Sequence, residues 1–239
     1  MSLKLNPWDK LLPNQAFNAD QYSGPGSIEQ SLYETILWSS AIPVPGTSFR
    51  IEQSDRFSIE EMASNAVALG FITWLLQLMK ARRVLEIGTF VGVSAMSFAK
   101  ALPPDGRVVT IEKFDHFAAI ARRNFAANGF KGRIDLVEGD AHDVLAKMHD
   151  RGPFDFAFID GNKERYADYF RLIEPLMAAG GVVAVDDAFF HGDALTEKPS
   201  TDKGRGVRKF LELAASAKDW RRILLPLSNG LMLMFKSAP

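Results

Sequence analysis

The chain has 239 residues, of which 47% are hydrophobic, and its formal net charge is −1. This length can bury the core of one α/β domain with an additional helical segment. The near-neutral balance gives no reason to expect a nucleic acid or a membrane surface as partner. The absence of cysteine excludes disulfides, thiolate metal ligands and cysteine nucleophiles. With no secretory signal and no apolar run of ~20 residues, we expect a cytoplasmic protein.

Residues 1–57 predict an N-terminal arm and a helix that precede the main domain. The polar segment 1–26 is interrupted by three prolines, and a helix with a good N-cap is expected to begin at Ser27. The sequence AIPVPG at 41–46 breaks that helix.

Residues 58–239 are predicted to form the main domain. An amphipathic helix over 58–80 is expected to begin at Ser58, with Glu61 completing a capping box. From residue 82 the pattern changes to apolar strands that alternate with helices. The expected strands are 82–87, 107–112, 133–139, 154–160 and 181–187, and the expected helices lie near 93–101, 115–128, 141–149 and 163–178.

The alternation indicates a parallel sheet that is covered by helices on both faces. Near the end of the chain, WRRILLPL and GLMLMFK flank Ser228, Asn229 and Gly230, which together are a strong hairpin signal. The predicted fold is therefore α/β: a doubly wound, mostly parallel, seven-stranded sheet that ends in an antiparallel hairpin. In such sheets ligands bind beyond the carboxyl ends of the strands.

The sequence VLEIGTFVGVS, which begins at Val84, places two glycines after the first expected strand. A dinucleotide loop needs a second glycine where this chain has Phe90, between Gly88 and Gly92. No lysine follows at the spacing of a P-loop. The pattern therefore favours a nucleoside ligand without phosphates.

Acidic residues stand at the ends of successive expected strands. Glu112 can accept hydrogen bonds from ribose hydroxyls, and Asp140 is placed to bind an adenine edge. Glu86 adds negative charge near a cationic end of the ligand. Each acid alone is more simply a solvated carboxylate, but the three acids and the glycine pair together indicate S-adenosylmethionine.

These motifs resemble the class I S-adenosylmethionine-dependent methyltransferases, and more narrowly the metal-dependent O-methyltransferases of the caffeoyl-CoA and catechol type. The resemblance covers about 58–239 and rests on EEMASNAVALGF, EIGTFVGVS, FIDGNKERY, GGVVAVDD and LPLSNGLMLMFK. It implies a Rossmann-like methyltransferase fold and a cofactor site. The implied cofactor contacts are Met62, Ser64, Glu86, Gly88, Thr89, Gly92, Ser94, Glu112, Asp140, Ala141 and Asp160.

The resemblance also implies a metal site formed by Asp160, Asp186 and Asp187. Three oxygen ligands favour Mg²⁺, with Mn²⁺ or Ca²⁺ as alternatives, over zinc. Without a cation these carboxylates would raise one another's pKa. The family usually has Asn where this chain has Asp187, so the extra charge would tighten metal binding but oppose an ionised substrate oxygen. The simpler interpretation is an acidic rim of the sheet.

Lys163 is expected in the first turn of a helix, where a cation is unfavourable. The resemblance implies that Lys163 takes or stabilises a hydroxyl proton while the metal lowers the pKa of that hydroxyl. The alternative is a solvated lysine beside Glu164. The predicted reaction transfers a methyl group from S-adenosylmethionine to a hydroxyl of a small, catechol-like aromatic acceptor, with Asp160 and Lys163 as catalytic residues.

Three other functions stay open from the sequence. A nicotinamide-dependent oxidoreductase shares the sheet but conflicts with Phe90, and a metal-dependent phosphatase would leave the glycine loop without a purpose. A non-catalytic cofactor-binding protein is the third.

The segment 188–206 predicts a mobile flap over the metal. Within it, Phe189 and Phe190 could pack on an aromatic acceptor or serve as hinge packing. The resemblance implies a homodimer, with the apolar helices before residue 80, including Trp38 and Trp74, as the candidate surface. The alternative is that these helices pack in the core. We expect the region 1–57 to contribute to substrate binding or to the dimer surface.

Overall fold

The computed structural model describes residues 35, 36, 39 and 48–237. Residues 48–237 lie within one compact unit, Pro43–Pro239. The predicted arm, Trp38 and most of the helix expected from Ser27 lie outside the described residues. The predicted domain boundary at 57/58 stays a prediction.

A seven-stranded sheet forms the centre of this unit, as the alternation of strands and helices predicts. Its spatial order is β3-β2-β1-β4-β5-β7-β6, so the chain runs outward in both directions from β1. The first five strands pair in parallel, and β7 pairs antiparallel with β5 and β6. The strands are β1 (Arg83–Ile87), β2 (Arg107–Glu112), β3 (Ile134–Glu138), β4 (Phe154–Ile159), β5 (Met177–Val185), β6 (Trp220–Leu225) and β7 (Leu231–Lys236).

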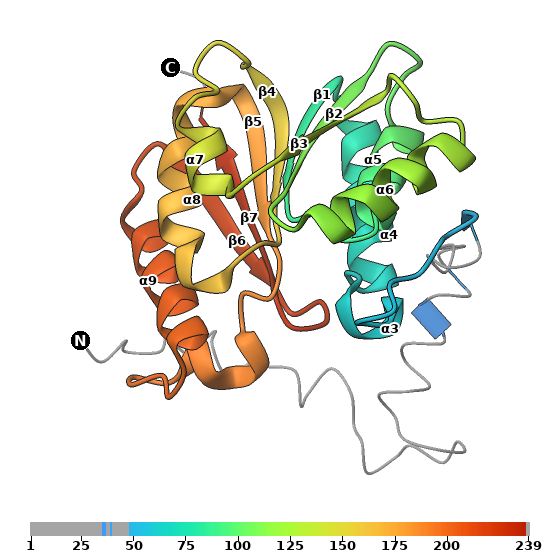
Figure 1. Cartoon of the computed structure of the whole chain (residues 1–239). Helices are drawn as coiled ribbons and strands as arrows, with labels where there is room; N and C mark the ends of the chain where they lie inside the picture. Colours follow the sequence, from blue (N-terminus) through green and yellow to red (C-terminus); the bar gives the residue numbers. More distant parts are fainter. Residues whose placement is uncertain (1–34, 37–38, 40–47, 238–239) are drawn as a thin grey trace. The chain divides into compact units, whose positions relative to one another are not determined.

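Helices cover both faces of the sheet (Figure 1). One group lies on one side: α4 (Ala66–Leu78), α5 (Val93–Ala101) and α6 (Asp115–Ala127). The other group lies on the opposite side: α7 (Ala141–Leu145), α8 (Tyr166–Ile173) and α9 (Asp202–Ser216). Each group packs on the sheet through its own buried apolar cluster. None of the helices in the described part of the chain is long and apolar enough to cross a membrane.

The prediction of a single helix over 58–80 is wrong, because the structure has two helices there. The short α3 (Ile59–Met62) ends before Ser64, and α4 begins after Asn65. The Asn65 side chain accepts a hydrogen bond from the N–H of Val67 and so caps α4. The apolar periodicity continues across the break and conceals it, because a cap in the middle of such a pattern gives only a weak local signal.

The helix predicted over 163–178 ends earlier than expected, and β5 begins at Met177 rather than at residue 181. A 3₁₀ turn at Lys163–Arg165 precedes α8, and a second 3₁₀ turn at Glu174–Leu176 follows it. The sequence did not predict α9, whose first turns fall in the segment assigned to the flap. Its glycines obscured the helical pattern there.

Candidate active site

The first loop glycine and the acidic residues at the strand ends meet at one edge of the sheet, as predicted. Gly88 follows β1, Glu112 ends β2, Asp140 follows β3, Asp160 follows β4 and Asp186 follows β5. Since all five strands are parallel, these residues occupy their common carboxyl edge. This edge is where ligands of doubly wound sheets bind.

The two loop glycines are required by close packing. Gly88 has φ +93°, and a Cβ built on it would lie 2.3 Å from the backbone oxygen of Asp160. Gly92 has φ +90°, and its Cβ would lie 2.3 Å from the ring of Phe125. A side chain at either position would therefore force the loop away from β4 or from α6.

Glu112 braces the glycine loop from the end of β2. Its Oε2 accepts hydrogen bonds from the N–H groups of Thr89 (3.2 Å) and Phe90 (2.8 Å). The Phe90 ring packs edge-on against Phe117 of α6, with 5.0 Å between ring centroids. The N–H groups of Thr89 and Phe90 are thus bonded to Glu112 and are not free to bind a diphosphate, which disfavours a dinucleotide. The expected reason was different, namely that the Phe90 side chain would obstruct the diphosphate.

The sequence predicted that Glu86 adds negative charge to the site, but its surroundings oppose ionisation. Its side chain is fully buried in β1, where Oε2 accepts a hydrogen bond from Thr110 and Oε1 has no partner. Burial raises the pKa of Glu86 to about 8, although hydrogen bonds from Ser94 and Thr110 oppose the rise. Burial therefore favours the protonated form of this carboxyl, because desolvation penalises its ionised form.

Asp140, which is predicted to bind the adenine, is the N-cap of α7. Its Oδ1 accepts the N–H of His142 at 3.0 Å, and its Oδ2 lies 3.0 Å from Lys113 Nζ. The hydrogen bond from Lys113 holds the pKa of Asp140 below its usual range. Ala141 is the buried first residue of α7.

The break between α3 and α4 brings Ser64 to the end of β4. Its Oγ donates a hydrogen bond to Asp160 Oδ2 at 3.2 Å. Met62, the last residue of α3, is 45% exposed, and Ser94 lies in the first turn of α5. The sequence predicted these residues as cofactor contacts but not the hydrogen bond that joins Ser64 to β4.

Lys163 lies between two of the three predicted metal ligands. Its Nζ is 2.8 Å from Asp160 Oδ1 and 2.9 Å from Asp187 Oδ2. Burial alone would lower the pKa of Lys163, but the charges of Asp160 and Asp187 outweigh burial and raise it. The solvated lysine of the alternative interpretation is therefore wrong, since only 16% of this side chain is exposed.

Burial and mutual repulsion act on the carboxylates as predicted. Burial raises the pKa of Asp160, against the opposing charge of Lys163. Burial also raises the pKa of Asp186 to about 7, with further rises from the charges of Asp160 and Asp187. The ammonium of Lys163 therefore does not fully offset the cost of ionising Asp160 and Asp186 in this buried cluster.

The donor set fits a hard divalent cation, because Asp160, Asp186 and Asp187 offer only carboxylate oxygens. Asp186 is 5% exposed, and its Oδ1 accepts a hydrogen bond from the N–H of Asp187 at 2.9 Å. Among the residues that the structure describes, however, no three His, Cys, Asp or Glu side chains are already grouped as metal ligands. The metal stays a prediction.

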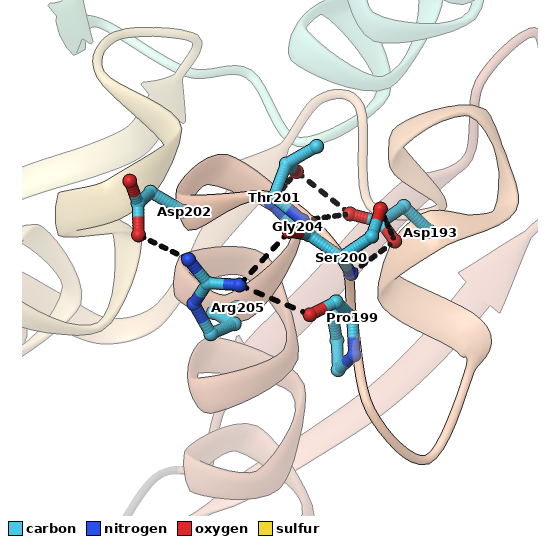
Figure 2. Close-up of polar contacts among 7 residues, drawn as sticks. All are labelled: Asp193, Pro199, Ser200, Thr201, Asp202, Gly204 and Arg205. Atoms are coloured by element: carbon cyan, nitrogen blue, oxygen red, sulfur yellow. Dashed lines mark hydrogen bonds and ion pairs between the residues drawn. The ribbon is translucent and has the colours of Figure 1, made fainter.

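The segment predicted as a flap is held together by hydrogen bonds between Asp193 and the residues just before α9, including its N-cap Thr201 (Figure 2). Asp193 accepts hydrogen bonds from the backbone N–H and hydroxyl groups of Ser200 and Thr201, at 2.7 to 3.1 Å. Gly204 leaves room for this carboxylate, because its Cβ would lie 2.0 Å from Asp193 Oδ2. The aromatic residue Phe189 packs on Gly230 of the hairpin, which favours the hinge-packing alternative.

Helix α9 also reaches the turn that carries Lys163. A Cβ on Gly206 would lie 2.4 Å from the Cα of Glu164 and 2.5 Å from the backbone oxygen of Lys163. Next to Lys163, the hydroxyl of Tyr166 is buried and has no hydrogen-bond partner. The sequence missed both features, because neither a helical glycine nor a tyrosine in an amphipathic helix gives a distinctive local signal.

Comparison with known proteins identifies the family. The family model described as O-methyltransferase matches residues 50–237. The chain belongs to this O-methyltransferase family. A catechol O-methyltransferase of Mycobacterium tuberculosis is 33% identical over 183 residues, which span 77% of this chain and 81% of that protein. A catechol O-methyltransferase of Niastella koreensis is 34% identical over 142 residues, or 59% of this chain and 64% of that protein, so this match covers less than two thirds of the relative.

Solved structures of O-methyltransferases share the fold. One from Bacillus cereus, in complex with SAH, has a TM-score of 0.70 and 26% identity, and the match covers 92% of this chain and 94% of that chain. TomG from Streptomyces achromogenes, in complex with SAM, has a TM-score of 0.70 and 29% identity, with the same coverage. These matches confirm the predicted S-adenosylmethionine-dependent O-methyltransferase class and its Rossmann-like fold. The roles of individual residues stay predictions.

Proposed function

We propose that this O-methyltransferase transfers the sulfonium methyl group of S-adenosylmethionine to a hydroxyl oxygen of a small, catechol-like aromatic acceptor. The observation that carries the proposal is the position of Asp160. Its backbone oxygen packs on Gly88 of the glycine loop, and its carboxylate contacts Lys163. A single residue thus joins the predicted cofactor loop to the predicted acceptor site. The names of the two catechol O-methyltransferases above support the acceptor class.

The cofactor is proposed to lie along the carboxyl edge between the glycine loop and α7. Glu112 keeps lone pairs that can accept ribose hydroxyls while it braces the loop. Asp140, held by Lys113 and the first turn of α7, would bind the adenine edge. Ser64 and Met62 contribute from the break before α4. None of these proposed cofactor contacts is a phosphate-binding group.

Asp160, Asp186 and Asp187 would hold the divalent cation, most readily Mg²⁺ because all donors are carboxylates. When bound, the cation supplies positive charge that lowers the pKa of an acceptor hydroxyl. Lys163 can act at this site in either of two protonation states. As an ammonium it stabilises the ionised oxygen, and once the aspartates are neutralised its pKa falls, so that it can accept the hydroxyl proton.

The remaining step is an in-line displacement at the methyl carbon. The ionised oxygen forms the new C–O bond, the C–S bond breaks, and the electron pair stays on sulfur. The products are a methyl ether and S-adenosylhomocysteine. The chain supplies mainly positioning and charge stabilisation, because the sulfonium is already reactive.

The test measures methyl transfer to a panel of catechols with Mg²⁺ and with EDTA. We expect turnover with Mg²⁺, its loss in EDTA, and its loss in Asp160→Ala. Asp105→Ala is the matched control, because Asp105 is an exposed carboxylate that precedes β2 at the opposite edge of the sheet. Full turnover in EDTA would remove the metal from the proposal. Full turnover in Asp160→Ala would contradict the site itself.

The homodimer also belongs to this proposal. On α4, Trp74 is 57% exposed and Leu78 is 63% exposed. Large apolar side chains that face solvent together are typical of association surfaces. This exposure supports the dimer that the family resemblance implies.

A further inference from the structure

Asn229, in the turn between β6 and β7, contacts the segment that follows β5. Its Nδ2 donates a hydrogen bond to Asp187 Oδ1 at 3.0 Å, and its Oδ1 accepts the N–H of His191 at 2.6 Å. Its backbone oxygen accepts the N–H of Phe189 at 2.8 Å. One turn residue therefore holds three residues of the segment 187–191.

This segment has a backbone that needs such support. Asp187, Phe190 and His191 all have positive φ values, of 54°, 43° and 53°. Residues other than glycine rarely adopt this left-handed conformation, and it persists only where the surroundings hold it. Strained backbone of this kind often occurs at functional sites, and this segment begins at a predicted metal ligand.

Asn229 also fixes the orientation of the Asp187 carboxylate. Oδ1 of Asp187 faces Asn229, whereas Oδ2 faces Lys163 at 2.9 Å. If Lys163 moves toward an acceptor oxygen, the bond from Asn229 still keeps Oδ2 directed at the cluster. The amide does this as a neutral donor, so it adds no charge beside the three aspartates.

We propose that Asn229 is a positioning residue of the methyl-transfer site, which orients Asp187 so that one oxygen faces the cation. The inference rests on the proposed function, because it assumes the divalent cation. The sequence marked Asn229 only as a turn residue. The tertiary structure adds the contact with a residue 42 positions earlier in the chain.

The first experiment titrates Mn²⁺ into wild-type protein and Asn229→Ala, with the free Mn²⁺ followed by electron paramagnetic resonance. We expect the Mn²⁺ dissociation constant to rise by about 10- to 100-fold in the variant, as is typical when a residue that orients a metal ligand is lost. The affinity for S-adenosylhomocysteine, measured by calorimetry, should not change. Ser228→Ala is the matched control, because Ser228 is an exposed residue of the same turn with φ +51°.

A second pair of variants separates positioning from charge and from folding. Asn229→Asp keeps a side-chain oxygen that can accept the N–H of His191, but it loses the amide N–H that donates to Asp187. Adding Asp187→Asn restores the hydrogen bond with donor and acceptor exchanged. Positioning predicts that the double variant binds Mn²⁺ more tightly than Asn229→Asp alone, even though it has one negative charge fewer. Charge alone predicts the opposite order.

The outcomes are distinguishable. Wild-type protein that binds no Mn²⁺ would overturn the metal in the proposed function, and this inference with it. Wild-type binding that is unchanged in Asn229→Ala would overturn only the role of Asn229. Weaker binding in the double variant than in Asn229→Asp would also overturn it, because the exchanged hydrogen bond would then have no effect.

Discussion

Gly88 packs the glycine loop against Asp160, which is predicted to be catalytic, and Gly88→Ala tests this contact directly. The Cβ of an alanine would lie 2.3 Å from the backbone oxygen of Asp160 and 2.9 Å from its carbonyl carbon. Both neighbours are backbone atoms at the end of a buried strand, so neither can rotate away. The substitution must therefore move the loop or Asp160.

The magnitude follows from two contributions. A left-handed φ costs an alanine about 1–2 kcal/mol, and overpacking of a close contact costs about 1–3 kcal/mol. The sum is about 2–5 kcal/mol of unfolding free energy. Gly129→Ala separates the contributions, because Gly129 has φ +76° but no atom within 4 Å of its built Cβ. That variant should lose only the conformational part.

The assay combines urea unfolding with calorimetric titration of S-adenosylhomocysteine and with methyl transfer. We expect Gly88→Ala to unfold more easily than Gly129→Ala, to bind the cofactor product weakly and to lose turnover. Gly129→Ala should keep both binding and turnover. Equal unfolding free energies for the two variants would refute the reasoning, because the contact between Gly88 and Asp160 would then cost nothing to disturb.

Two further predictions concern pH. The pKa of Glu86 is raised from 4.5 to about 8, so between these pH values the folded protein holds a proton that the unfolded chain releases. As pH rises from 4.5 to 8, the unfolding free energy of wild type should therefore fall relative to that of Glu86→Gln. Urea unfolding that shows a constant difference between the two proteins over this range would contradict the prediction. The pKa of Asp193 is lowered from 3.8 to about 2 by hydrogen bonds from Thr201 and Ser200. Its stabilisation is complete above pH 3.8 and is lost through pH 2, so the difference in unfolding temperature between wild type and Asp193→Asn should shrink over that range, and a gap that stays constant there would count against the Asp193 contacts.

Most of the sheet could be predicted because its strands are short apolar runs between clear turn signals. β2 lies at the predicted residues, and the hairpin follows the signal at Ser228, Asn229 and Gly230. Helix α9 could not be predicted, because Gly204 and Gly206 resemble loop residues locally. Both are helical here because α9 packs against Asp193 and against the turn of Lys163, and a larger side chain would prevent that contact.

The candidate site shows the same division. The glycine pair and the strand-end acids could be found from the sequence, because parallel strands bring their carboxyl ends to one edge. The protonation of Glu86 could not be predicted, since burial rather than position along the chain sets its pKa. The ion pairs of Lys163 and the hydrogen bond from Asn229 to Asp187 likewise join groups whose distance only the packed structure defines.

The sequence by itself predicted the strands along the chain, the edge at which the acids gather and a glycine loop that does not match a phosphate-binding pattern, because hydrophobic period and turn chemistry are local properties of the chain. The tertiary structure alone decided which carboxyl group keeps its proton, where Lys163 rests and which turn residue holds Asp187. These features depend on desolvation and on distances between residues far apart in the chain, and both arise only when the sheet and its helices pack together.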